Sequence, residues 1–294
     1  MKLTQQQIQT YETQGLVIVR NLFSDDDLQP VINELMAEID ARANALHAAG
    51  KIEHMHQEAP FTQRYGLLFG QCQEVGEDFD IMYYRGRAIF DFLHHPKLLD
   101  AAGGLVGPNI TCSPIHHLRA KPPETVEPYV GPSFHNAPWH QDAAGMMAEA
   151  EDSNVVTCWI PLGDAKVEMG CMQAIPGAID NGYLRHLEEG GTVIDPQIMP
   201  QQEPLTLACL KGDVVFLNRF TPHRSTRNKS DKCRWSLDLR YQTTGHHTGR
   251  TAHPEFIVRA PDDPSSVMDD YDTWCRLWID AFENPRGFAG HRFE

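Results

Sequence analysis

The chain has 294 residues, of which 41% are hydrophobic and 22% are charged, and its formal net charge is -15 at pH 7. This composition is typical of a globular protein that buries a sizeable core. The negative charge disfavours nucleic acid and anionic membranes as main partners, because these polyanions repel an acidic surface. We therefore expect a small-molecule partner, and the sequence leaves the oligomeric state open.

The first part of the chain is predicted to be mainly helical. Thr4 is a possible N-cap, and apolar residues recur at helical spacing in the next long segment. Helices are predicted at 4–14, 24–49, 88–93 and 96–105, and a β-branched run predicts a buried strand at 16–19. Residues 51–87 show no clear period, and we interpret them as an irregular segment with some helix that could cover a site.

Beyond residue 105 the pattern changes to short β-type runs separated by Pro and Gly, which favours a sandwich or barrel. Strands are predicted at 110–119, 154–162, 170–175, 205–209, 213–217 and 234–242. The loop 122–138 holds five prolines, too many for regular structure. The last predicted element is a helix at about 271–282. We expect a single domain, 1–294, built from a helical part at 1–105, a β core at about 106–245 and a C-terminal extension at 246–294.

The cysteines and the amino terminus indicate the compartment. The seven cysteines form no C-x-x-C pair, and a chain of this size does not need disulfides, so we expect reduced thiols. The amino terminus is polar, and no apolar run reaches the roughly 18 residues that a membrane helix needs. We therefore expect a cytoplasmic protein without a signal peptide or membrane anchor.

Three residues form a candidate metal site. His140 and Asp142 lie two residues apart, so on a strand an imidazole and a carboxylate would leave from the same face. His223 follows a strong predicted strand and the turn Thr221-Pro222. Two histidines and one carboxylate bind ferrous iron and leave other positions open for substrates. In a chain with 15 histidines the His-x-Asp triplet alone is weak evidence for a metal site, so the hypothesis depends on His223 as the third ligand.

Arg234 lies eleven residues beyond His223, at the head of the last predicted strand. The guanidinium fork binds a carboxylate through two parallel hydrogen bonds, which suits the far end of a diacid. Four other polar residues could face a substrate or form structural ion pairs: Tyr83, Arg85, Arg87 and Arg240.

These motifs resemble the phytanoyl-CoA dioxygenase family of iron- and 2-oxoglutarate-dependent oxygenases. The resemblance rests on Trp139-His140-Gln141-Asp142, Trp159-Ile160-Pro161-Leu162, Gly170 with Ile175-Pro176-Gly177, Lys211-Gly212-Asp213, and His223-x-Ser225 with Arg234. It also includes Tyr11-x-x-x-Gly15, Gly107-Pro108-Asn109 and Lys121-Pro122-Pro123, and it extends to about residue 245. The fold that it implies is mainly β with flanking helices, a double-stranded β-helix of the jelly-roll, cupin-like type.

The implied activity is that of an oxidoreductase that hydroxylates an unactivated C–H bond of a small molecule. 2-Oxoglutarate and O2 would be consumed, and succinate and CO2 released. The resemblance implies Fe(II) held by His140, Asp142 and His223. Halogenating relatives lose the carboxylate, so Asp142 favours hydroxylation, or a related desaturation or cyclisation.

The resemblance also implies a cosubstrate pocket. Arg234, with help from Ser225, would hold the tail of 2-oxoglutarate, and Trp159 would form a wall of the pocket. His117 lies near a cosubstrate-contacting position but differs in type from the family. A lysine that contacts the cosubstrate in some members has no clear counterpart.

The sequence departs from the family in one loop and leaves other functions open. Glu168-Met169-Gly170 and Pro176-Gly177-Ala178-Ile179 stand where the family has Glu-Asn-Gly and Pro-Gly-Ser-His, so substrate contacts from that loop cannot be transferred. A non-oxygenase zinc or manganese cupin would use similar ligands but has no need of Arg234. A non-catalytic small-molecule-binding jelly-roll would leave the complete ligand set unexplained. The substrate is not identified.

Overall fold

A computed structural model describes residues 1–124, 136–189 and 191–293, so most of the predicted proline-rich loop lies outside the described residues. Its α-helices are α1 (Gln5–Gln14), α2 (Asp25–Ala48), α3 (Phe61–Gln71), α4 (Ile81–Tyr84), α5 (Arg87–Leu93), α6 (Pro96–Val106) and α7 (Tyr271–Glu283). Its strands are β1 (Leu16–Val19), β2 (Ile110–Cys112), β3 (His117–Lys121), β4 (Val155–Pro161), β5 (Met172–Ala174), β6 (His186–Glu188), β7 (Thr192–Ile194), β8 (Leu205–Leu207), β9 (Val214–Asn218), β10 (His223–Ser225), β11 (Arg234–Thr243) and β12 (Phe256–Arg259).

The long predicted helices are confirmed to within one residue at each end. In α1 the Thr4 hydroxyl accepts from the Gln7 amide at 3.2 Å, and the Gln7 side chain accepts from the Thr4 amide at 2.8 Å, which completes a capping box. Gly15 ends this helix in the left-handed conformation, with φ of 76°. A Cβ at Gly15 would lie 2.5 Å from the hydroxyl of Thr221, so glycine also allows the close approach of the turn before His223.

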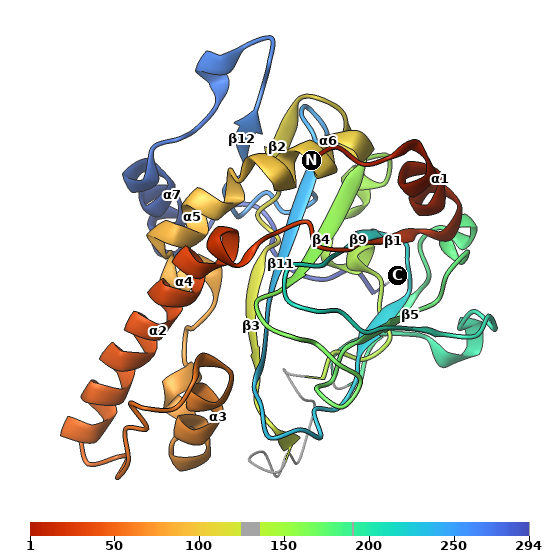
Figure 1. The fold of residues 1–294 in the computed structure, drawn as a ribbon. Helices are drawn as coiled ribbons and strands as arrows, with labels where there is room; N and C mark the ends of the chain where they lie inside the picture. Colours follow the sequence, from red (N-terminus) through yellow and green to blue (C-terminus); the bar gives the residue numbers. More distant parts are fainter. Residues whose placement is uncertain (125–135, 190, 294) are drawn as a thin grey trace.

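Two antiparallel sheets face each other (Figure 1). The larger has the order β1-β9-β4-β11-β2-β12, with β3 paired to β11 as well, and the smaller has the order β10-β5-β8. Trp159 and Val215 of the large sheet pack with Met172 and Leu207 of the small sheet in one buried cluster. The helices α2, α3 and α5 lie on the opposite side of the large sheet (Figure 1). The helices cover one side of the large sheet with an apolar core, so the polar side chains of its strands lie on the other side, between the two sheets.

The alternation along β11 explains how one strand serves both sides of the sheet. Its apolar side chains join the helix-facing core and are Trp235, Leu237, Leu239 and Tyr241. Burying each contributes about 1.5–3 kcal/mol. The intervening residues face the other sheet and are Arg234, Ser236, Asp238 and Arg240. A slip of one residue would place these charges in the core, so the register is strongly specified.

Some strand predictions were wrong in detail. The single strand predicted at 110–119 is two strands, β2 and β3, which pair with successive parts of β11. The break contains Pro114, which has no N–H to donate to a ladder. The short strands β6, β7, β10 and β12 were not predicted, because three or four residues are too few to show a period.

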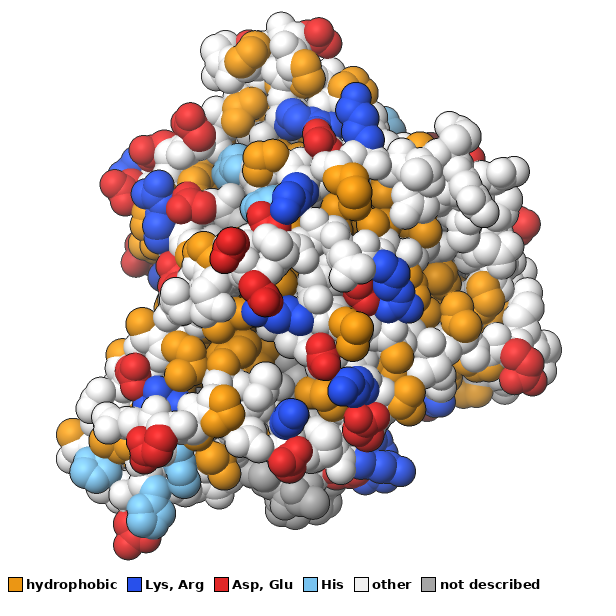
Figure 2. Space-filling view, viewed as in Figure 1, with side chains coloured by type: hydrophobic (Ala, Val, Ile, Leu, Met, Phe, Trp, Pro, Cys, Tyr) orange, Lys and Arg blue, Asp and Glu red, His pale blue; other side chains and the backbone are white. Residues whose placement is uncertain are grey.

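None of the seven cysteines forms a disulfide in the structure. None of the helices in the described ranges combines the length and the apolar character needed to cross a bilayer. On the face seen in Figure 2, lysine and arginine side chains are dispersed among acidic ones and form no continuous basic stripe.

Candidate active site

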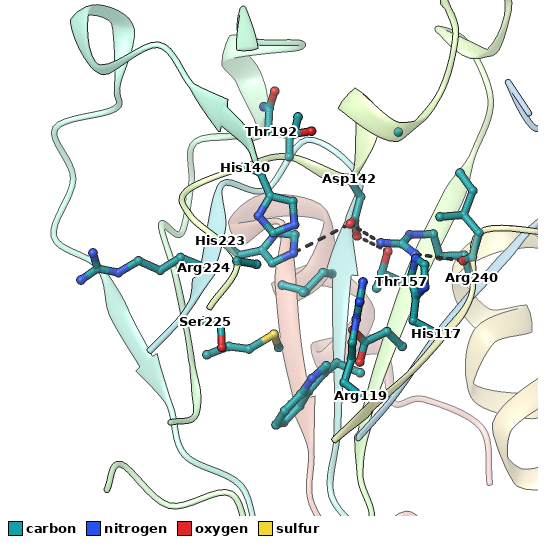
Figure 3. Close-up of a pocket in the computed structure, with 18 of the residues that line it drawn as sticks. His117, Arg119, His140, Asp142, Thr157, Thr192, His223, Arg224, Ser225 and Arg240 are labelled. Atoms are coloured by element: carbon teal, nitrogen blue, oxygen red, sulfur yellow. Dashed lines mark hydrogen bonds and ion pairs between the residues drawn. The ribbon is translucent and has the colours of Figure 1, made fainter. Parts of the chain in front are cut away.

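His140, Asp142 and His223 converge between the two sheets (Figure 3). One ligand atom from each lies within 4.8 Å of the others, close enough for a single ion. The two histidines face each other across an isolated β-bridge, in which the His140 amide donates to the His223 carbonyl at 3.0 Å and the reverse bond is 2.9 Å. His140 is an isolated bridge residue, Gln141 is extended, and Asp142 begins a short 3-10 helix, Asp142–Gly145. The two residues therefore do not lie on a regular strand, as the prediction assumed, but their ligand atoms still meet at one centre.

Hydrogen bonds orient both imidazoles. Nδ1 of His140 lies 2.8 Å from the Pro138 carbonyl, and Nδ1 of His223 lies 3.0 Å from the Thr221 carbonyl. A carbonyl can only accept, so we assign the proton to Nδ1 in each ring, which leaves the Nε2 lone pair for a metal. Burial, reinforced by the neighbouring His223, lowers the pKa of His140 to about 3. The imidazole of His140 is therefore in its neutral, ligating form at neutral pH.

The carboxylate of Asp142 is held on both oxygens. Oδ1 forms an ion pair with Arg240, and Oδ2 accepts from the hydroxyl of Thr157. Burial alone would raise the pKa of Asp142, but the charge of Arg240, with smaller contributions from His223 and His140, lowers it well below its usual range. Arg240 also donates to the Ile115 carbonyl at 2.9 Å. Of the two interpretations of Arg240, the structure shows the ion pair.

Gln141 fixes the backbone between the two ligands. Its side chain is completely buried, donates to the carbonyls of Gly182 at 2.8 Å and Phe220 at 2.7 Å, and accepts from the amide of Leu184 at 2.8 Å. Its own amide donates to Nε2 of His186 at 3.0 Å. Every polar group of this residue is thus used to hold the triplet, a role that its sequence position did not reveal.

A cavity of about 160 Å³ extends from these three residues. All of the residues predicted to hold iron or cosubstrate line it: His117, His140, Asp142, Trp159, His223, Ser225 and Arg234. The Pro176–Ile179 loop does not contribute to the described lining. The β4–β11 register places Thr157 opposite Arg240 and Trp159 opposite Asp238, so Trp159 lies between the triad and Arg234.

Arg234 is a buried cation without a carboxylate partner among the described residues. Its guanidinium donates to the Ser236 hydroxyl at 3.0 Å and stacks 5.2 Å from the centre of the Trp159 ring. Its Nε has no hydrogen-bond partner in the described structure. Burial lowers the pKa of this guanidinium from its ordinary value. Because an uncompensated buried charge is costly, this arrangement favours an anionic ligand at Arg234.

Lys121 joins Arg234 and Ser225 at this end of the cavity. It pairs in register with Arg234 across β3 and β11, and its ammonium donates to the Ser225 hydroxyl at 2.5 Å and to the Thr226 carbonyl. No lysine is recognisable from the sequence as a counterpart of the cosubstrate-contacting lysine of the family, and Lys121 belongs there only to the Lys121-Pro122-Pro123 motif.

His117 is anchored by Asp80, in the segment that was expected to cover the site. Nδ1 of His117 lies 2.7 Å from Oδ2 of Asp80, whose Oδ1 accepts from the amides of Ile81 and Leu118, each at 2.7 Å. Burial lowers the pKa of His117. No sequence pattern indicates this role of Asp80, because its partner His117 lies 37 residues away.

Thr157 offers a test of how the carboxylate is held. We expect Thr157→Val, which keeps the shape and removes the hydroxyl, to weaken Fe(II) binding about tenfold, since a group that orients a ligand commonly contributes 10–100-fold to affinity. Titration of Fe(II) under anaerobic conditions measures this.

The control is Thr111→Val, which removes another buried hydroxyl, bonded to Thr244 at 3.1 Å and outside the cavity. It should leave the iron affinity unchanged. Equal iron affinities for Thr157→Val and the unmodified protein would contradict the assigned role.

The chain is similar to known proteins in both sequence and fold. The sequence model described as "Phytanoyl-CoA dioxygenase (PhyH)" matches residues 11–236. The mouse (Mus musculus) protein named "Phytanoyl-CoA dioxygenase, peroxisomal" is 26% identical over 293 residues, which cover 92% of this chain and 80% of the relative.

Two solved structures share the fold. The apo non-heme monooxygenase ThoJ aligns with a TM-score of 0.61 at 19% identity, over 95% of this chain and 94% of that chain. The non-heme alpha ketoglutarate dependent carbocyclase SnoK, from nogalamycin biosynthesis, aligns with a TM-score of 0.55 at 18% identity, over 90% of this chain and 89% of that chain. These similarities confirm the predicted double-stranded β-helix.

Proposed function

Because this chain belongs to the phytanoyl-CoA dioxygenase family and is therefore an iron- and 2-oxoglutarate-dependent dioxygenase, we propose that it hydroxylates an unactivated C–H bond of a small molecule. In this proposal His140, Asp142 and His223 hold the iron. Bound iron, with 2-oxoglutarate and O2, supplies the oxidising chemistry that protein side chains lack. The whole chain would act as one domain, since residues 250 and 291 of the C-terminal extension also line the cavity.

Hydrogen bonds and an ion pair within the protein orient the three metal ligands. The carbonyls of Pro138 and Thr221 fix the ring orientation of the two histidines. Arg240 and Thr157 hold the carboxylate of Asp142 in its ionised form. Such supporting contacts raise metal affinity because little reorganisation remains. Two imidazole nitrogens and one carboxylate are the donor set that suits ferrous iron.

The opposite end of the cavity suits the tail of 2-oxoglutarate. Arg234 would bind the distal carboxylate through its guanidinium fork, and the Ser225 hydroxyl and the Lys121 ammonium lie beside it. Trp159 would pack along the carbon chain, and His117 would line the pocket as a neutral imidazole. The single observation that carries the proposal is the combination of a prepared ligand triad and an uncompensated buried arginine in one cavity. A metal enzyme without a diacid cosubstrate has no use for this arginine.

The location in the cell stays a prediction. Seven free thiols favour a reducing compartment such as the cytoplasm, and the mouse relative is peroxisomal by name.

Anaerobic addition of Fe(II) and then 2-oxoglutarate to the metal-free protein tests the proposal. We expect the weak visible charge-transfer band of an iron–2-oxoglutarate complex. Subsequent exposure to O2 with a candidate substrate should release succinate and add one oxygen atom to the substrate, labelled when 18O2 is used. A product that carries the label would establish hydroxylation. A desaturated or cyclised product would instead show that the enzyme catalyses desaturation or cyclisation.

His140→Ala should lose the band because it removes one ligand. The matched control is His47→Ala on the exposed surface of α2, which should retain it. Iron binding without any band in the unmodified protein would overturn the proposal.

A further inference from the structure

The cavity carries far more positive charge than the protein around it. Its cationic lining residues are Arg119, Lys121, Arg224, Arg234, Arg240 and Arg250, and its carboxylates are Asp142 and Asp238. The chain as a whole has a net charge of -15. Among the described lining residues, six cations thus stand against two carboxylates in an otherwise acidic protein, which indicates that the cavity binds anions. The two carboxylates of 2-oxoglutarate account for only part of this excess of positive charge.

Most of these cations already have a partner or an assigned role. Arg240 pairs with Asp142, and Arg119 lies 3.7 Å from Asp238. Arg224 binds the Gln173 side chain at 2.7 Å and points away from the triad (Figure 3). Lys121 and Arg234 form the proposed cosubstrate end. Among the described cations that line the cavity, Arg250 is the one without a side-chain partner or an assigned role.

Arg250 is a charged group held close to the metal ligands. Its Nε donates to the carbonyl of Gly145 at 2.7 Å, three residues after Asp142. No carboxylate among the described residues pairs with it. Burial lowers its pKa to about 10, so the guanidinium keeps its charge at neutral pH. His291 and Ile115 line the cavity beside Gly145, each within 4.0 Å of where a Cβ on that glycine would lie.

This charge lies at the other end of the cavity from Arg234. Arg234 and Arg240 are six residues apart on β11, so their Cα atoms are about 20 Å apart along the strand. Arg240 contacts Asp142 and the Ile115 carbonyl, which places the Arg250 end beside the metal ligands and away from the cosubstrate tail. Arg250 therefore cannot share the carboxylate that Arg234 would bind.

The residues of this second end come from the C-terminal extension. Both Arg250 and His291 lie beyond residue 236, the last residue that the family model matches. The extension is fixed to the segment after Asp142, because the Met147 amide donates to the Gly249 carbonyl at 3.0 Å and the Arg292 amide to the Ala144 carbonyl at 2.7 Å. The C-terminal extension thus forms the cavity wall beside the metal ligands.

We propose that Arg250, with His291 beside it, binds an anionic group of the substrate, so that the substrate is a small carboxylate or phosphate ester whose charge lies close to the oxidised carbon. This inference rests on the proposed function. A coenzyme A thioester does not fit it, because the thioester carbonyl near the reacting carbon is neutral and its phosphates lie far from that carbon. An arginine fork binds both kinds of oxyanion, so the experiment has to distinguish them.

The test uses protein loaded anaerobically with Fe(II) and 2-oxoglutarate. The probes are short-chain and aromatic carboxylic acids, their methyl esters, their coenzyme A thioesters, and the phosphate monoesters of the matching alcohols. Perturbation of the charge-transfer band and the rise in melting temperature report binding. We expect the acids or the phosphate monoesters to bind at concentrations about tenfold lower than the neutral esters or the thioesters. Whichever of these two anion classes binds more tightly identifies the anionic group of the substrate.

Arg250→Leu should raise the half-saturating concentration of the acids that bind the unmodified protein about 10–100-fold, as expected for loss of hydrogen bonds to a charged group. The value for Arg250→Lys should lie between those of the unmodified protein and Arg250→Leu. Arg286→Leu is the matched control, because it removes an exposed arginine of the same extension that does not line the cavity.

The inference fails if no acid or phosphate monoester binds better than its neutral counterpart, or if Arg250→Leu binds the acids as tightly as the unmodified protein does. The band before any probe is added reports on iron and 2-oxoglutarate alone. Its absence would count against the proposed function, whereas a normal band without anion preference would count against this inference only.

Discussion

Asp142→Ala is expected to lose iron binding and to destabilise the metal-free protein as well. The substitution removes one of three ligands, so the affinity for Fe(II) should fall more than about 100-fold, which exceeds the usual effect of a merely supporting residue. It also leaves the buried guanidinium of Arg240 without its anion. Breaking a buried pair in this way typically costs about 3–5 kcal/mol of folding free energy. Anaerobic iron titration and urea unfolding measure the two effects separately.

The double variant Asp142→Ala with Arg240→Met separates the ligand role from the structural role. It should recover most of the lost stability, because no uncompensated charge remains, but it should not recover iron binding. The surface control Asp25→Ala removes a carboxylate that pairs with Lys211 at 2.7 Å, and it should cost less than about 1 kcal/mol. Unchanged stability of Asp142→Ala would show that Arg240 finds another partner.

Arg234→Met is expected to weaken 2-oxoglutarate binding strongly without reducing the stability of the protein free of cosubstrate. Each hydrogen bond to a charged group contributes about 1.5–3 kcal/mol, so losing a two-bond grip should lower the affinity roughly 100-fold or more. The same change removes a buried charge that has no carboxylate partner among the described residues. Replacing such a charge by an apolar side chain of similar length is commonly neutral or stabilising.

Saturation of the charge-transfer band with 2-oxoglutarate gives the affinity, and urea unfolding of the metal-free protein gives the stability. Arg234→Lys should bind 2-oxoglutarate with intermediate affinity, because it keeps the charge but not the planar fork. Wild-type affinity in Arg234→Met would remove Arg234 from the cosubstrate site. A loss of several kcal/mol in stability would instead assign it a structural role.

The His140–Asp142 pair and much of the secondary structure were predictable because their signals are local. The His-x-Asp spacing is a property of an extended backbone, and the alternation in β11 records which side chains face the helices and which face the cavity. The capping box at Thr4 and the turn at Gly15 are likewise set by neighbours in the chain. The resemblance to a known family then linked His223 and Arg234 to this pattern across long separations.

The groups that support the ligands were not predictable in the same way. Asp142 is held by Arg240, 98 residues away, Ser225 by Lys121, 104 residues away, and His117 by Asp80. These pairs depend on strand register and on how the loops pack, and no local pattern of residue types contains that information. Arg250 is a further case, because only the folding of the extension against Gly145 brings it to the cavity.

The sequence by itself therefore predicted the candidate metal ligands, the candidate cosubstrate arginine and the class of fold, since local patterns and the resemblance to a known family pointed to the same residues. Only the tertiary structure decided which charges are paired and which are left for ligands. The physical reason is that a charge is stabilised or left uncompensated by the groups that surround it in space, and antiparallel pairing brings those groups together from distant parts of the chain.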